Sequence, residues 1–176
     1  MRFLVTGSQM RALDQHTIEK LGIPGIDLMR TAGEAVAEFC KSIMSEPGST
    51  TIVCGKGNNG GDGFIVAASL AAAGHSVCVF ILGERDAISG DAALALQGMD
   101  DMLPSEQLHV YFLGDESFDA LFQESLDGSV LVIDALLGTG INKPVREPFL
   151  STIQEINGSG CPIISVDIPS GVDAST

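Results

Sequence analysis

The stretch GKGNNGGDGF, at positions 55–64, combines a glycine pattern with three polar side chains. Its first, third and sixth residues spell G-x-G-x-x-G, which binds dinucleotide phosphates when it lies between a strand and a helix. Asn58, Asn59 and Asp62 stand inside or beside the pattern. A carboxylate near a bare pyrophosphate is repulsive unless it binds ligand hydroxyls, caps the helix or faces a cation. A structural turn with Asp62 as the helix N-cap therefore explains the same residues.

Two further polar clusters follow apolar runs in the C-terminal half. The run VIDALLGTGINKP places Asp134 before a glycine-rich loop, and SVDIPSGVD places Asp167 shortly before Ser170. With Asn59, these residues offer carboxylate, amide and hydroxyl oxygens without Cys or His, which is the ligand chemistry of a hard cation. Few donors and little ligand charge favour a monovalent cation.

Carboxylates are the leading acid–base candidates. The histidines at 16, 75 and 109 fall in a helix, a turn and a strand start, where surface or turn roles are expected. Asp167 is the first choice, because it ends an apolar strand where desolvation raises a carboxyl pKa. The competing interpretation is that Asp167 only caps the turn before Pro169.

The elements that carry these residues follow from hydrophobic patterning. Two helices are expected in the first 45 residues, one beginning with Ser8 as N-cap and one with apolar residues at helical spacing that include Phe39. Five apolar runs without alternation then alternate with helical segments, which predicts a mostly parallel sheet covered on both faces. The expected strands lie in 49–55, 75–83, 108–114, 129–138 and 161–171, and the expected helices in 63–74, 89–99, 117–126 and 147–157. Because the sequence stops soon after the fifth strand, we expect an incomplete C-terminal edge.

Composition narrows the classes of partner. The 176 residues are 45% hydrophobic and carry a net charge of −14, which disfavours nucleic acid and anionic membrane as partners. No apolar run reaches membrane-spanning length, and no secretory signal is recognisable at the start. Four cysteines without C-x-x-C spacing fit a reduced protein, so we expect a cytoplasmic location.

Several motifs together resemble the YjeF N-terminal domain family of NAD(P)H-hydrate epimerases. They are MRALDQHTIEKLGIPGIDLM, GKGNNGGDGFIVAASLAAAGHSV, SGDA, DALLGTGINKPV and VDIPSGVDAST. The resemblance implies a Rossmann-like three-layer αβα sandwich over 1–176, with N-terminal helices in 1–45 and a core in 50–176. It also implies a homodimer that interconverts the R and S forms of NADHX and NADPHX, one K+ per subunit, and a partner or fused dehydratase that depends on ADP or ATP.

The resemblance assigns roles to individual residues. Substrate contacts are expected at Asn58, Asn59, Gly60, Gly61, Asp62, Gly138, Thr139, Gly140, Ile141, Asn142, Lys143, Pro144 and Asp167, and K+ ligands at Asn59, Asp134 and Ser170. Asp167 is our candidate catalytic residue: it would protonate the leaving hydroxyl and then accept a proton from the incoming water. The chain departs from the family at Arg30 and Thr31, where an acid and an amide are common.

Two other functions account for part of the pattern. A non-catalytic binding module of this family could dispense with Asn59, Asp134, Asp167 and Ser170, and their presence favours the enzyme. A plain NAD-dependent oxidoreductase lacks an evident residue for hydride transfer and leaves the cluster of asparagines and aspartate unexplained.

Overall fold

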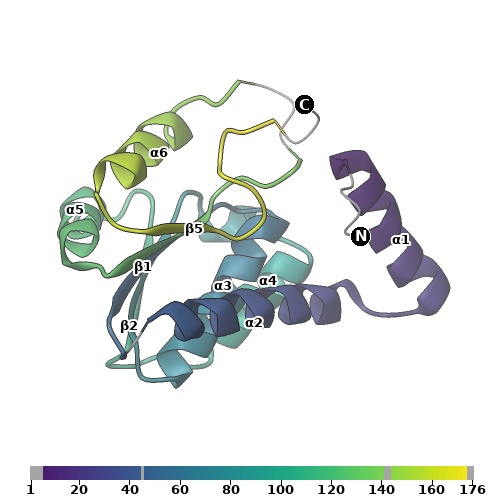
Figure 1. The fold of residues 1–176 in the computed structure, drawn as a ribbon, viewed down its shortest axis with the longest axis horizontal. Helices are drawn as coiled ribbons and strands as arrows, with labels where there is room; N and C mark the ends of the chain where they lie inside the picture. The colour runs from purple at the N-terminus through teal and green to yellow at the C-terminus, as the bar shows by residue number, and fades with distance from the viewer. Residues whose placement is uncertain (1–5, 45, 141–143, 174–176) are drawn as a thin grey trace.

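Five parallel strands form the middle layer of a three-layer α/β fold (Figure 1). The computed structural model describes residues 6–44, 46–140 and 144–173. The strands lie in the sheet in the order β3-β2-β1-β4-β5. Their bounds are β1 Ser49–Cys54, β2 Ser76–Ile81, β3 Leu108–Phe112, β4 Leu131–Ala135 and β5 Ile163–Ser165. The predicted parallel sheet and its five strands are confirmed.

The order of the strands determines where a ligand can enter. The chain runs outward from β1 through β2 to β3, and then returns to the other side of β1 with β4 and β5. The connections therefore diverge between β1 and β4. In open parallel sheets such a point leaves a crevice outside the carboxyl ends of the strands.

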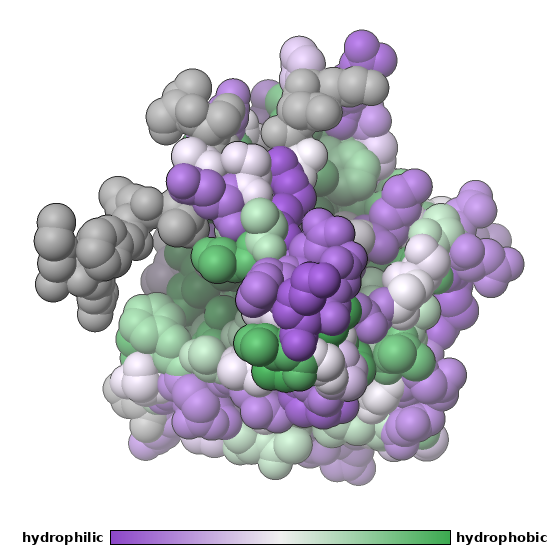
Figure 2. Space-filling model, turned by 90° about the vertical axis from the view of Figure 1, so that its right-hand side faces the viewer, coloured by the Kyte–Doolittle hydropathy of each residue, from purple (hydrophilic) through white to green (hydrophobic). Residues whose placement is uncertain are grey.

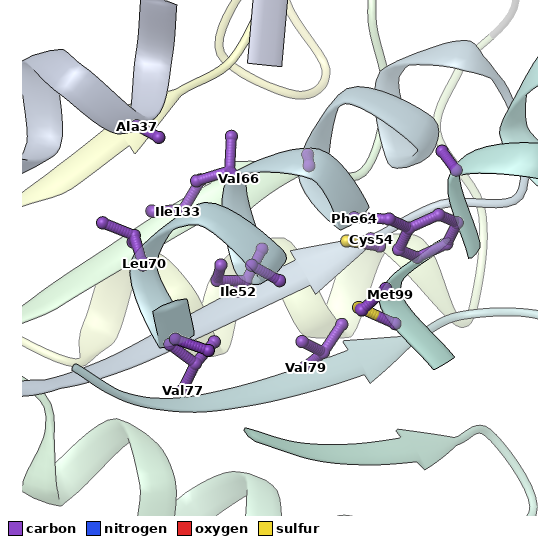
Figure 3. Close-up of a cluster of buried hydrophobic side chains, with 14 of the residues drawn as sticks. Ala37, Ile52, Cys54, Phe64, Val66, Leu70, Val77, Val79, Met99 and Ile133 are labelled. Atoms are coloured by element: carbon purple, nitrogen blue, oxygen red, sulfur yellow. The ribbon is translucent and has the colours of Figure 1, made fainter. Parts of the chain in front are cut away.

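Helices cover both faces of the sheet. α2 (Gly25–Ile43), α3 (Asn58–Ala72) and α4 (Asp91–Asp100) lie on one side, and α5 (Phe118–Gly128) and α6 (Phe149–Gly158) lie on the other (Figure 1). Neighbouring residues of β1 serve opposite cores, because side chains alternate along a strand. Ile52 packs with Val66 and Leu70 of α3 in the core that Figure 3 shows, whereas Val53 packs with Phe122 of α5.

The buried face of α2 is not the one that the spacing of its apolar residues predicts. Met29, Gly33, Ala37 and Cys40 are buried, while Phe39 is 56% exposed. Gly33 explains why this face of α2 is the buried one. A Cβ at this position would lie 2.6 Å from the Cβ of Ile65, so α2 and α3 approach each other closely there. A glycine thus marks the contact face, and Phe39 is left outside it.

α1 (Gly7–Leu21) lies beside the sheet and its covering helices, at the right of Figure 1. Its N-cap is Thr6 rather than the expected Ser8, because the Thr6 side chain accepts from the Gln9 backbone while Gln9 bonds back to the Thr6 N–H. Its large apolar residues are exposed, and Figure 2, viewed from the side of α1, shows hydrophobic surface next to hydrophilic surface. Among the described residues, no helix is long and apolar enough to cross a bilayer.

Candidate functional site

A cavity of about 680 Å³ opens at the carboxyl ends of β1 and β4. Its walls come from α1, α2, the β1–α3 loop with the start of α3, the loop after β4, the start of α6 and the segment after β5 (Figure 1). The predicted site residues that line it are Asn58, Asn59, Asp62, Gly138, Thr139, Gly140 and Asp167. The structure therefore brings together residues that are more than 100 positions apart in the sequence.

Some predicted residues lie elsewhere. Gly60 and Gly61 are buried under the loop instead of lining the cavity, and Pro144 also lies outside its wall. Ile141, Asn142 and Lys143 lie outside the described residues.

The glycine fingerprint packs the loop against the helix. A Cβ on Gly60 would collide with the carbonyl oxygen of Gly55, whereas a Cβ on Gly57 would meet open space. The N-cap of α3 is Gly57, without a side-chain cap, and Asp62 is the fifth residue of the helix. The interpretation of Asp62 as a helix cap is therefore wrong, and its carboxyl group is free for a role at the cavity.

Asp134 joins the loops that follow β4 and β5. The side chain is 6% exposed and accepts four hydrogen bonds from protein groups. Ser170 gives two of them, from its Oγ to Oδ1 at 2.6 Å and from its N–H to Oδ2 at 2.8 Å. The Leu136 N–H reaches Oδ1 at 3.2 Å and the Ser165 hydroxyl reaches Oδ2 at 3.3 Å. This buried carboxylate holds the turn at Ser170 against the end of β4.

Asn59 brings unmet hydrogen-bonding capacity to the cavity wall. Both polar atoms of its side chain are shielded from solvent and have no partner in the protein. A buried amide without partners is costly, so a ligand or cation would stabilise it. Asn59 lies against Gly138, where a Cβ would sit 3.4 Å from the Asn59 Cβ and 2.7 Å from Asp167 Oδ2. Gly138 thus leaves the space in which Asn59 and Asp167 approach each other.

The three predicted cation ligands fall into two neighbouring groups. Asp134 and Ser170 bond directly and line a different cavity from Asn59, which lies against Gly138. The two groups meet at one loop, because the N–H of Leu137, the residue before Gly138, donates to Ser170 Oγ at 2.9 Å. Within the part of the chain that the structure describes, no group of three or more His, Cys, Asp or Glu could hold a metal. The donors present, amide, hydroxyl and carboxylate oxygens with one negative charge, fit a monovalent cation better than a transition metal.

Asp167 follows β5 at the cavity wall. Its Oδ2 accepts the Thr139 backbone N–H at 2.8 Å, which fixes the carboxyl group against the loop after β4. The expected burial of Asp167 is wrong: the residue is exposed, because β5 is a three-residue strand at the edge of the described sheet.

The surroundings of Asp62 raise the pKa of its carboxyl group. Its pKa rises from 3.8 to about 7, chiefly because burial penalises the charged form, and further because Asp167 and Asp14 are negative neighbours. Asp14 comes from α1, which the sequence gives no reason to place at this cavity. The altered acidity of Asp62 is therefore a property of the tertiary structure.

α1 supplies wall residues that sequence reasoning missed. Met10, Arg11 and Asp14 line the cavity, and the Arg11 guanidinium donates to the Thr139 carbonyl oxygen at 3.3 Å. Arg11 and Lys56 are the cations of the described wall. No local pattern in the sequence of α1 indicates that its polar side chains lie at this cavity.

Comparison with known proteins finds one matching family and relatives that share one name. The sequence profile of the family described as "YjeF-related protein N-terminus" matches residues 25–176. A protein named NAD(P)H-hydrate epimerase from Rhodopirellula baltica is 33% identical over 98% of this chain and 67% of its own length. One of the same name from Limosilactobacillus fermentum is 32% identical over 98% of this chain and 76% of its own length.

Longer relatives match in the same region. The "Bifunctional NAD(P)H-hydrate repair enzyme Nnr" of Thermofilum pendens is 36% identical over 96% of this chain, and this chain spans 31% of that protein. Among solved structures, the yeast protein YNL200c superposes with a TM-score of 0.77 and 25% identity, covering 97% of this chain and 72% of its own.

Proposed function

This chain belongs to the YjeF-related protein N-terminus family, and on that premise we propose that it is an NAD(P)H-hydrate epimerase. Its substrates would be the R and S forms of NADHX and NADPHX, dinucleotides damaged by hydration of the nicotinamide ring. One observation carries the proposal: the cavity at the switch point of the sheet is lined by an unpartnered amide, Asn59, and by carboxyl groups that include Asp62 and Asp167. Such a wall offers both ligand binding and proton transfer.

The reaction needs a proton donor and acceptor near the hydroxylated ring carbon. This carbon adjoins the ring nitrogen. Once the hydroxyl is protonated, the nitrogen lone pair can expel it as water, which leaves an iminium ion. Water then adds to the opposite face. In this proposal Asp167 takes part in proton transfer, Asn58 and Asn59 bind polar groups of the substrate, and Thr139 and Gly140 contact it from the loop after β4.

A bound K+ fits the oxygen donors of the site. We assign it to Asn59, Asp134 and Ser170, because Asn59 lacks a partner and Asp134 contributes a negative charge. Bound there, a cation would offset part of the acidic charge at the cavity and stabilise the loops after β1, β4 and β5.

The remaining parts of the proposal concern location and partners. The cysteines at 40, 54, 78 and 161 are free, as expected for a reducing cytoplasm. This chain spans about a third of the bifunctional relatives, so we propose that it acts with, or fused to, a dehydratase that removes water from the epimerised dinucleotide. A homodimer is part of the same proposal.

The test is direct. Separated R-NADHX or S-NADHX is incubated with the protein and K+, and the two epimers are followed by chromatography against the spontaneous rate. We expect equilibration at least 100-fold faster than the control without protein, and loss of most of this acceleration in Asp167→Asn. An unchanged rate with wild-type protein contradicts the proposed function, and full activity in the variant contradicts the role of Asp167.

A further inference from the structure

Inversion at one carbon demands proton transfer on both sides of the ring. The hydroxyl leaves from one face of C6, and the new hydroxyl arrives on the other. A single carboxyl group positioned to protonate the first oxygen lies on the wrong side to deprotonate the second. Proton transfer to or from a reacting group requires hydrogen-bonding distance or one bridging water. An epimerase of this kind therefore benefits from two groups that approach the ring from different directions.

The described wall of the cavity holds three carboxyl groups, and two of them, Asp62 and Asp167, lie on elements that follow different strands of the sheet. Asp62 lies in the first part of α3, after β1, and Asp167 lies in the segment after β5. Gly138 stands beside Asp167, where a Cβ would come within 2.7 Å of Oδ2, so the absence of a side chain keeps the space in front of this carboxyl group open. Both aspartates line the same cavity of about 680 Å³.

The two carboxyl groups are held differently. Asp167 is exposed and is oriented by the Thr139 N–H. Asp62 is partly buried, and burial with the charges of Asp167 and Asp14 raises its pKa to about 7. The other charged groups of the described wall are Asp14 and Arg11 of α1, Lys56 of the loop, and Asp167. Asp62 is thus suited to carry a proton at neutral pH, and Asp167 is held in place by its hydrogen bond to the loop after β4.

We propose that Asp62 and Asp167 are two catalytic residues serving opposite faces of the substrate ring, an inference that rests on the proposed epimerase function. Asp62 gives its proton to the C6 hydroxyl, the C–O bond breaks, and water leaves as the nitrogen lone pair forms the iminium ion. A second water attacks C6 from the other face and loses a proton to Asp167. For the opposite epimer the roles exchange. Atoms and charge balance: one water leaves, one enters, and one proton passes from Asp62 to Asp167.

The proton must be returned between turnovers. Solvent in the open cavity can re-equilibrate the two carboxyl groups, or a molecule of the opposite epimer can return the proton in reverse. The protein therefore has two protonation forms, and each form acts on one epimer. Every inversion also replaces the C6 oxygen with oxygen from solvent.

Oxygen exchange in H2(18)O tests this assignment. In wild-type protein, each inverted molecule should carry one solvent oxygen. In Asp62→Asn, epimerisation should fall by about 100-fold or more. Asp167 can still expel and re-add water on its own face, so this variant should keep exchanging oxygen in one epimer without inverting it. Asp167→Asn should keep exchange in the other epimer.

Asp127→Asn is the matched control. It removes an exposed carboxyl group of α5 that does not line the cavity, so both inversion and exchange should persist at the wild-type rate. Circular dichroism confirms that each variant is folded.

Three outcomes would overturn the inference. These are epimerisation by Asp62→Asn within tenfold of wild type, equal loss of exchange for both epimers in that variant, or inversion by wild-type protein without solvent oxygen in the product. Failure of the wild-type protein to accelerate epimerisation is a different result and contradicts the proposed function itself.

Discussion

Replacing Asp134 by Asn should destabilise the fold, although the two side chains have nearly the same shape. The Asp134 carboxylate accepts two bonds at each oxygen, and all four partners are donors in this arrangement. Asparagine has one acceptor oxygen and an NH2 group. Whichever way the amide turns, its nitrogen faces groups that were donating to the carboxylate.

The size of the destabilisation depends on which hydrogen-bond donor is left without an acceptor in the variant. With the amide nitrogen at the Oδ2 position, the Ser165 hydroxyl can rotate and accept, but the Ser170 N–H at 2.8 Å cannot. A buried N–H without a partner costs about 1–3 kcal/mol, and the bonds at Oδ1 lose their charge assistance, each worth about 0.5–1 kcal/mol. We expect a loss of about 2–4 kcal/mol in the free energy of unfolding, a large part of the ~5–15 kcal/mol typical of a domain.

The assay is urea unfolding followed by circular dichroism, in a buffer whose only monovalent cation is tetramethylammonium. Without K+, the measured difference reports the protein's own hydrogen bonds. Asp127→Asn, on the exposed side of α5, is the matched control and should change stability by less than about 0.5 kcal/mol. Adding K+ should then stabilise wild-type protein more than the Asp134 variant. An Asp134→Asn protein as stable as the control would refute the argument that this carboxylate joins the two loops.

Three further predictions use other features of the structure. Gly60→Ala should cost about 1–3 kcal/mol or prevent folding, because its Cβ would meet the Gly55 carbonyl oxygen, whereas Gly57→Ala should be nearly neutral; thermal melts compare them. Because the pKa of Asp62 is raised from 3.8 to about 7, the folded chain holds this proton more tightly than the unfolded chain, so stability should fall as pH rises through that interval. Asp62→Asn should remove the slope and be more stable than wild type at pH 8 by about 2–4 kcal/mol in urea titrations. Thr6→Ala should weaken the start of α1 by about 1 kcal/mol, seen as faster hydrogen exchange in α1 with unchanged exchange in β1.

The sheet could be predicted from the sequence because its signals are local. Each strand is an apolar run without alternation, as expected for strands covered on both faces, and each is followed by a helical segment. The helix boundaries were less certain: Thr6 rather than Ser8 caps α1, since either residue could have done so by type. The contact face of α2 was also misjudged, because Phe39 fits the apolar periodicity but only Gly33 lets α3 come close.

The residues of the site were predictable as a list, whereas their environments were not. Acidic and amide residues at strand ends could be placed at one edge of the sheet, because parallel strands carry their carboxyl ends together. Exposure of Asp167 and burial of Asp62 invert the expectation that the strand-end carboxyl is the desolvated one. This inversion depends on the edge position of β5 and on the tertiary surroundings of Asp62, and neither is a local property of the sequence.

The acidic composition of the chain and the chemistry proposed for the cavity bear on each other. The proposed dinucleotide substrate would bring at least two negative charges to a wall that already carries Asp14, Asp62 and Asp167, against Arg11 and Lys56. If all three aspartates were ionised, the wall would repel this substrate. A protonated Asp62 removes one of these charges, and in the proposed reaction its proton is the one that the leaving hydroxyl requires. Substrate binding should in turn favour the protonated form, because the added negative charge raises the pKa of Asp62 further. In the proposed reaction, binding and proton delivery would be coupled through a single carboxyl group. This would account for an acid in the first turns of α3, directly after a glycine pattern that is otherwise typical of phosphate binding.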